Sequence, residues 1–306
     1  MSSQSTRQKP ISRHVGALLC VLAATLAIHS IDSDRTSLIL GGLRNAGHLP
    51  LFGALSLVVF SIVKSTARPY LTTVTVCLVI ALISELSQML TGGDVDWRDG
   101  VADSIGTALF LGAHRLWTQR TPLRAVLAGL LILISVLPAL FWSAQWALRR
   151  ADAPCLITER WPLRRAVAQA FASTATRPAN EPALVALTLD TRRYAGLRLH
   201  DPIADWRRFD ALVLRARTAP GSEGPLTVRI HDGAHNNELH DRFNRTLELT
   251  TTPTAFRIPI DAIRAAPVGR TMDIGDISQV SLFRVDARQG AVIFIDSLCL
   301  APTSAQ

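Results

Sequence analysis

The stretch LRAVLAGLLILISVLPALFW, residues 123–142, has one charged side chain in twenty positions and is long enough to cross a bilayer as a helix. After Ser143, charged residues recur every few positions, and no later apolar run has this length. The sequence therefore predicts a boundary near residue 145, with a membrane region before it and a soluble domain after it.

Four further apolar blocks precede this stretch, at about residues 15–31, 47–63, 70–90 and 100–117. Together the blocks predict an α-helical transmembrane bundle of about five spans over residues 1–146. The fourth block contains Asp103, so its insertion depends on contacts with neighbouring helices. The first block could instead be a cleaved signal peptide, because a basic tail precedes it.

Basic residues cluster in alternate connections between the blocks, which predicts that those connections are cytoplasmic. The clusters are Arg7, Lys9 and Arg13, then Lys64 and Arg68, then Arg115, Arg120 and Arg124. An odd number of spans then places the C-terminal domain outside. We expect a multi-pass protein of the bacterial cytoplasmic (inner) membrane, with its N-terminus in the cytoplasm and its C-terminal domain in the periplasm.

The net charge of +8 does not indicate a nucleic-acid partner, because it is spread over the whole chain. Residues 1–143 hold 11 basic and 7 acidic side chains, and the remainder holds 21 and 17. No basic run or RNA-binding motif interrupts this even distribution. The predicted partner is therefore the lipid bilayer, with no nucleic acid.

Six polar side chains lie near the outer ends of the second, third and fourth blocks: Asn45, His48, Glu85, Gln88, Asp99 and Asp103. Spacings of three or four residues put each pair on one helix face, which predicts a small ligand-binding pocket that opens outward. Carboxylates beside an imidazole could act as general acid and base, with Glu85, Asp99, Asp103 and His48 as catalytic candidates. They could also hold a divalent cation, or hydrogen-bond one another and fix the helix register.

At these residues the chain resembles the VanZ-like family of membrane proteins, over about residues 40–115. The matching stretches are RNAGHLPLF (44–52), ELSQ (85–88) and DGVADSIG (99–106). Asn45 and Asp103 stand where the family usually has Lys and Asn. The family is named for a glycopeptide-resistance protein, so the resemblance implies a role in the cell envelope but no defined activity.

The soluble region is predicted to contain a connector over residues 147–181, with a short helix at RWPLRRAVAQAF (160–171), and then a β-sandwich over 182–303. Alternating apolar and polar residues, as in Leu226 to His231, predict half-buried strands. About eight such runs, separated by Gly, Pro and Asp, indicate two packed sheets.

The order of WRRFDALVLRAR (206–217), DRFNRTLEL (241–249), FRIPI (256–260) and IDSLCL (295–300) resembles the galactose-binding-like jelly roll of many carbohydrate-binding modules. This resemblance implies a cell-wall or polysaccharide ligand. The aromatic candidates to contact a sugar are few: Tyr194, Trp206, Phe243 and Phe256, of which Trp206 and the Phe residues are predicted to be core. The stretch HDGAHNNELHDRFNR (231–245) is the preferred polar ligand surface, with a solvated loop as the alternative.

Cys155 and Cys299 bracket the soluble domain and could form a disulfide in an oxidising compartment. Asp296 is the candidate for a structural calcium site. The sequence identifies no cofactor.

These observations predict an envelope protein that binds, or is accessory to, a cell-wall, lipid-linked or surface-polysaccharide ligand. One alternative is a membrane-embedded enzyme that acts on such a glycan with its outer-leaflet carboxylates. A second alternative is a small-solute transporter.

Overall fold

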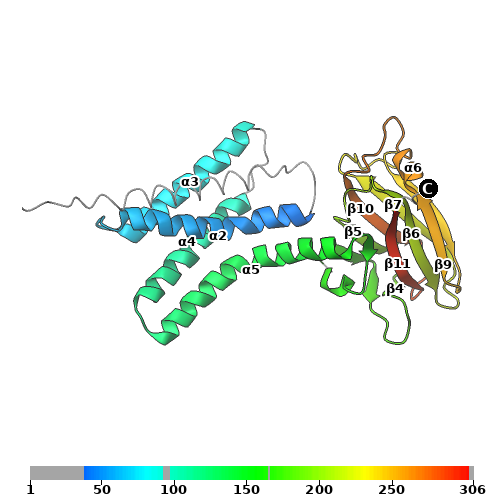
Figure 1. The fold of residues 1–306 in the computed structure, drawn as a ribbon, viewed down its shortest axis with the longest axis horizontal. Helices are drawn as coiled ribbons and strands as arrows, with labels where there is room; N and C mark the ends of the chain where they lie inside the picture. The colour runs from blue at the N-terminus through cyan, green and yellow to red at the C-terminus, as the bar shows by residue number, and fades with distance from the viewer. Residues whose placement is uncertain (1–37, 92–96, 165, 303–306) are drawn as a thin grey trace, which may run out of the picture. The chain divides into compact units, whose positions relative to one another are not determined.

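The computed structural model describes residues 38–91, 97–164 and 166–302. Their contacts divide the chain into two compact units (Figure 1). The described part of the helical unit lies within residues 40–143, and the mostly β unit contains the residues from Ala144 onward together with Leu38 and Ile39. The first predicted span, at 15–31, lies outside the described residues.

Four helices form the first part of the described chain: α2 (Leu38–Val63), α3 (Pro69–Thr91), α4 (Trp97–Thr118) and α5 (Pro122–Asp152). Each helix covers one predicted block and extends beyond it. By length and composition, α2, α3 and α5 contain segments that could cross a membrane, and α4 does not. Helix α4 covers the span predicted at 100–117 and carries four charged residues, Arg98, Asp99, Asp103 and Arg115.

Small residues allow α4 to approach α2 closely. A Cβ atom on Gly106 would lie 2.1 Å from the backbone oxygen of Leu49, so this contact requires glycine. The ring of Phe110 likewise lies where a side chain at Gly53 would stand. Around these contacts, α2 and α3 share a small apolar core of Phe52, Leu55, Val59, Cys77 and Ala81.

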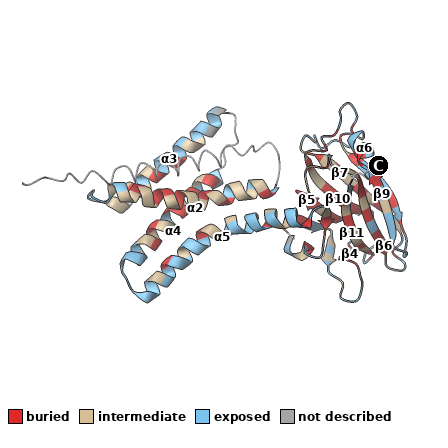
Figure 2. Ribbon diagram, viewed as in Figure 1, coloured by how far each residue is buried: buried red, intermediate tan, exposed pale blue. Residues whose placement is uncertain are grey.

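The outer surfaces of α3 and α5 are apolar and exposed (Figure 2). Leu82, Ile83 and Leu90 on α3 and Leu123 and Val126 on α5 are each more than half exposed. Exposed apolar surface of this extent is unusual for a soluble helix and is expected where lipid or protein covers it.

The β unit is a sandwich of two antiparallel sheets. Sheet A has the order β3-β4-β11-β6-β9, with β1 also paired to β11, and sheet B has the order β2-β5-β10-β7-β8. The strands of sheet A are β1 (Cys155–Ile157), β3 (Ser173–Thr176), β4 (Val185–Leu189), β6 (Phe209–Thr218), β9 (Thr254–Pro259) and β11 (Val292–Pro302). The strands of sheet B are β2 (Ala168–Phe171), β5 (Tyr194–His200), β7 (Gly224–Asp232), β8 (Phe243–Leu249) and β10 (Ile277–Val285).

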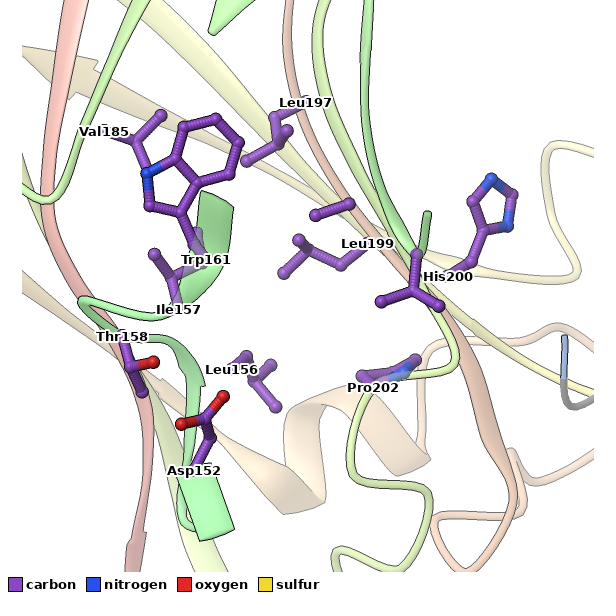
Figure 3. Close-up of a pocket in the computed structure, with 12 residues that line it drawn as sticks. Asp152, Leu156, Ile157, Thr158, Trp161, Val185, Leu197, Leu199, His200 and Pro202 are labelled. Atoms are coloured by element: carbon purple, nitrogen blue, oxygen red, sulfur yellow. The ribbon is translucent and has the colours of Figure 1, made fainter. Parts of the chain in front are cut away.

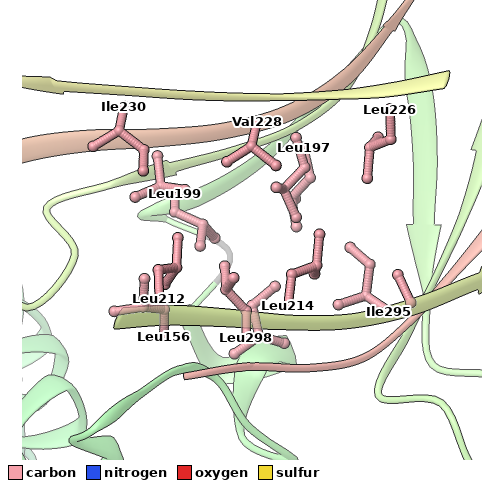
Figure 4. Packing of buried hydrophobic residues seen from close by; sticks show 14 of the residues in the cluster. Leu156, Leu197, Leu199, Leu212, Leu214, Leu226, Val228, Ile230, Ile295 and Leu298 are labelled. Atoms are coloured by element: carbon pink, nitrogen blue, oxygen red, sulfur yellow. The ribbon is translucent and has the colours of Figure 1, made fainter. Parts of the chain in front are cut away.

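Alternation of apolar and polar residues builds the core between the sheets. In β7, Leu226, Val228 and Ile230 are fully buried, whereas the intervening side chains point to the outer face. Figure 4 shows these three side chains facing Leu212 and Leu214 of β6 across the sandwich. The prediction of two sheets with half-buried strands is confirmed, and Trp206 lies in the core, as expected.

The predicted connector over 147–181 is wrong, because most of it belongs to the folded units. Helix α5 continues to Asp152, and β1, the 3₁₀ helix η1 (Trp161–Arg164), β2 and β3 follow before residue 177. The helix predicted at 160–171 is η1 followed by strand β2, whose hydrogen bonds to β5 determine its conformation. Tertiary pairing outweighs the local helix preference of this Arg- and Ala-rich segment.

A disulfide joins Cys155 in β1 to Cys299 in β11. The two residues are also direct partners in the strand register. The bond closes a loop with a sequence separation of 144 residues, and so it links the start of the β unit to its last strand.

Candidate functional site

A buried ionisable cluster lies between α2 and α4 in the described part of the helical unit. His48 lies on α2, and its Nδ1 atom is 2.8 Å from Oδ1 of Asp103, while its Nε2 atom is 3.7 Å from Oδ2 of Asp99. The three side chains are 3–5% exposed. The spacing of four residues in α4 places both carboxylates on the face that packs against His48.

The imidazole of His48 therefore lies between two carboxylates in a nearly dry environment. A buried His is stable beside a carboxylate because the pair satisfies both hydrogen-bonding groups. The close approach at Gly106, one turn below Asp103, keeps the two helices near enough for this contact. The geometry fixes the register of α2 against α4.

The other predicted cluster residues occupy different environments. Asn45 is exposed and accepts a hydrogen bond from Nε of its neighbour Arg44. Glu85 is half-buried on α3, and its carboxylate interacts electrostatically with His48. The side chain of Gln88 lies outside the described residues. The structure thus brings His48 into contact with Asp99 and Asp103 and near enough to Glu85 for an electrostatic interaction, whereas Asn45 is exposed.

The β unit carries a second candidate site on the outer face of sheet B. The strand registers align one polar row across all five strands, formed by Gln169, Arg198, Ser281, Arg229 and Asn244. Residues in direct register share a face of the sheet, so these side chains are neighbours. Nε of Arg229 donates to Oδ1 of Asn244 at 3.2 Å.

Aromatic rings lie beside this polar row. Phe171 and Phe283 have ring centroids 6.4 Å apart, and Tyr194 meets Phe283 edge-on at 5.8 Å. The guanidinium of Arg198 lies 5.2 Å from the ring centre of Phe171, and that of Arg229 lies 4.6 Å from the ring centre of Phe283. We call Phe171, Tyr194, Arg198, Arg229 and Phe283 together the arginine–aromatic face.

Tyr194 is the exposed residue of the arginine–aromatic face, and Arg198, Arg229 and Phe171 are partly exposed. Tyr194 is 44% exposed, whereas Phe283 is only 3% exposed because the neighbouring side chains cover it. Phe283 therefore forms the floor of the face, and the guanidinium groups and the phenol ring form its surface. Such a surface offers hydrogen-bond donors together with a flat apolar ring.

Sequence reasoning found only Tyr194 among these five residues. Phe171 was hidden by the incorrect helix over 160–171. Phe283 lies in the run SLFRVD, where apolar Phe283 and Val285 alternate with polar Arg284 and Asp286, a pattern that predicts Phe283 on the core face. In the structure Leu282 and Arg284 are buried and Val285 is 46% exposed, so Phe283 lies on the outer face instead.

Polar side chains of the stretch 231–245 form hydrogen bonds with one another's segments and with Arg270. Arg270 donates to both oxygens of Asp232, at 2.6 and 2.8 Å, and also to Asp241. Asp241 in turn accepts from the backbone N–H of Asn236 at 2.8 Å. These contacts support a structural role for the stretch, in which Arg270 connects it to the segment before β10.

The cavity in Figure 3 is too small for a ligand. It lies among Asp152, Leu156, Trp161, Leu197 and further residues of the β unit, and its volume is about 10 Å³. This volume holds about one water molecule.

Asp296, the calcium candidate, lies 3.6 Å from Nε of Arg215. Among the described residues, no group of three or more His, Cys, Asp or Glu side chains could hold a metal ion. The carboxylate of Asp296 therefore has a cationic neighbour within its own sheet.

No protein-family model matches the chain, and no curated protein matches it in sequence. Solved structures do match, at low identity. The family 11 carbohydrate-binding module from Clostridium thermocellum, in complex with a β-1,3-1,4-mixed-linked tetrasaccharide, is 14% identical, with a TM-score of 0.35 over 44% of this chain and 84% of that one.

An exo-β-agarase is 13% identical, with a TM-score of 0.38 over 46% of this chain and 24% of that one. A family 29 carbohydrate-binding module is 12% identical, with a TM-score of 0.30 over 43% of this chain and 74% of that one. All three matched proteins are under 15% identical to this chain, and each match covers less than half of it.

Proposed function

We propose that the β unit binds a polysaccharide through the arginine–aromatic face. The observation that carries this proposal is the row of Gln169, Arg198, Ser281, Arg229 and Asn244 beside the ring of Tyr194. Sugars present hydroxyl groups at their edges and apolar C–H groups on their faces. Amide and guanidinium groups complement the former, and an exposed aromatic ring complements the latter.

In this proposal the helical unit is a VanZ-like membrane anchor in the cytoplasmic membrane, with the β unit in the periplasm. The exposed apolar surfaces of α3 and α5 and the alternation of basic connections support this orientation. The disulfide between Cys155 and Cys299 supports it as well, because disulfides persist in oxidising compartments. The protein then holds an envelope polysaccharide at the membrane surface.

Binding of the full-length protein, in nanodiscs of phosphatidylcholine, to a panel of neutral and acidic polysaccharides tests the proposal. Tyr194→Ala should weaken binding about tenfold, the order expected from the loss of one stacking ring at 1–1.5 kcal/mol. Phe294→Ala is the matched control, because Phe294 lies under Arg217 on sheet A, outside the arginine–aromatic face. Absence of binding to every polysaccharide, or equal losses in both variants, would contradict the proposal.

A second candidate function is an enzyme that uses the carboxylates around His48. The pair of Asp103 and His48 at 2.8 Å is the observation that favours it, since a carboxylate can orient an imidazole for proton transfer. Asp99→Asn separates this role from a structural one. A catalytic Asp99 predicts lost turnover with unchanged thermal unfolding in detergent, whereas a structural Asp99 predicts a lower Tm.

A further inference from the structure

The two outer faces of the β-sandwich differ in how their arginines are neutralised. On sheet A each of three arginines has a carboxylate partner: Arg215 with Asp296 at 3.6 Å, Arg217 with Glu181 at 2.6 Å, and Arg257 with Asp210 at 2.8 Å. Positive charge on this face is therefore compensated within the protein.

On sheet B, within the described residues, the arginines have no such partner. Arg229 bonds only the neutral amide of Asn244. The Nε atoms of Arg198 and Arg242 are buried and make no hydrogen bond in the described part of the chain. Arg242 precedes β8 and continues the outward-facing positions of that strand, so three guanidinium groups share one face.

These charges act on one another. Burial lowers the pKa of Arg229, and the positive charges of Arg242 and Arg198 lower it further. Burial and the charge of Arg198 likewise lower the pKa of His200, which lies at the end of β5. An anion bound at this face would relieve the repulsion, and so it would bind more tightly than a neutral molecule of the same shape.

We infer that the ligand of the arginine–aromatic face is an anionic polysaccharide, whose sugars carry carboxylate, sulfate or phosphate groups. The inference rests on the proposed polysaccharide-binding function and narrows its ligand class. Arg198 and Arg229 lie two strands apart, roughly 10 Å at the usual strand spacing, so one chain can present an anionic group to each.

The stacking on Phe171 and Phe283 is important for this selectivity. A ring beneath each guanidinium fixes the plane of the group and leaves N–H donors for an acceptor above it. Planar guanidinium groups bind carboxylate, sulfate and phosphate oxygens in pairs of parallel hydrogen bonds, which neutral hydroxyl groups do not match in strength.

The test uses two pairs of polymers with the same backbone, of which one member is charged and the other neutral: polygalacturonate with its methyl ester, and dextran sulfate with dextran. Full-length protein in phosphatidylcholine nanodiscs should bind the charged member of at least one pair about tenfold more tightly, and added salt should reduce this preference. Arg198→Gln with Arg229→Gln should abolish the preference. Arg198→Lys with Arg229→Lys should keep part of it, because the charge remains.

Arg215→Gln with Arg257→Gln is the matched control, since it removes two positive charges from sheet A. Both glutamine double variants lower the net charge of the protein by two, so they weaken its nonspecific attraction to anionic polymers equally. The sheet A variant should therefore keep the preference for charged polymers within about threefold of wild type. Hydrogen exchange of the β-unit peptides establishes that each variant is folded.

Equal affinity for charged and neutral polymers would overturn the inference and leave polysaccharide binding intact. Equal losses in the two glutamine variants would also overturn it. Tighter binding of dihexanoyl phosphatidylglycerol than of any charged polymer would identify a lipid headgroup as the ligand and overturn it too. Failure to bind any polymer, neutral or charged, would instead refute the proposed function itself.

Discussion

Replacement of Arg270 by methionine is expected to destabilise the β unit strongly. The side chain of Asp232 has no exposure, and it receives hydrogen bonds of 2.6 and 2.8 Å from Arg270 and one of 2.8 Å from the backbone N–H of Asp273. Arg270→Met leaves this buried carboxylate with a single donor. Breaking a buried pair in this way costs about 3–5 kcal/mol, and the 28% exposure of Arg270 favours the lower end, about 3 kcal/mol.

Hydrogen exchange measured by mass spectrometry on the full-length protein in detergent reports this loss. A loss of about 3 kcal/mol corresponds to roughly 100-fold faster exchange of the slowest amides of β7, β8 and β10 at pH 7. A double variant, Asp232→Asn with Arg270→Met, should recover part of the protection, because it removes the unpaired charge.

The stability lost in Arg270→Met should be smaller at low pH than at neutral pH. The hydrogen bonds from Arg270 lower the pKa of Asp241 to about 2. Burial alone would raise the pKa of Asp232, but hydrogen bonds from Arg270 and Asp273 outweigh burial and lower it. Carboxyls with lowered pKa values stabilise the fold above their ordinary pKa of about 4, and this stability is lost as the pH falls through the folded values. The difference between wild type and Arg270→Met should therefore be full at pH 7 and smaller at pH 3.

Arg257→Met is the control, because it breaks an exposed pair with Asp210 in the same unit. Exposed pairs contribute about 0.2–1 kcal/mol, so exchange should change by about fivefold or less. If hydrogen exchange in Arg270→Met is no faster than in Arg257→Met, the hydrogen bonds from Arg270 to Asp232 and Asp241 do not stabilise the β unit as argued.

Two further predictions follow from the same structure. Cys155→Ser with Cys299→Ser opens a loop of 144 residues and should destabilise the β unit by about 5 kcal/mol relative to the oxidised wild type, measured by urea unfolding. The reduced wild type should behave like the variant. Gly106→Val places a side chain against the backbone oxygen of Leu49, so it should lower the Tm in detergent by several degrees or more. Gly100→Ala is the control and should have little effect, because a Cβ atom there meets nothing within 4 Å. An unchanged Tm for Gly106→Val would show that α4 does not need its close contact with α2.

Local sequence patterns determined most of the architecture. The apolar blocks and the change of composition at Ser143 predicted the helices and the division into two units, because burial in lipid or in a core requires runs of fixed length and period. Period-two alternation predicted the sandwich for the same reason. Helical spacing predicted that Asp99 and Asp103 share one face of their helix, which depends only on the local geometry of α4.

Tertiary contacts decided the rest. Strand β2 forms only because β5 offers hydrogen-bond partners, so its segment resembled a helix when considered alone, and Phe171 was missed with it. Asn45 follows the same helical spacing as His48, but its position on α2 leaves it exposed. The row that joins Arg198 to Arg229 depends on the register of three strands that are distant in sequence, and register is fixed by pairing and core packing rather than by any one strand.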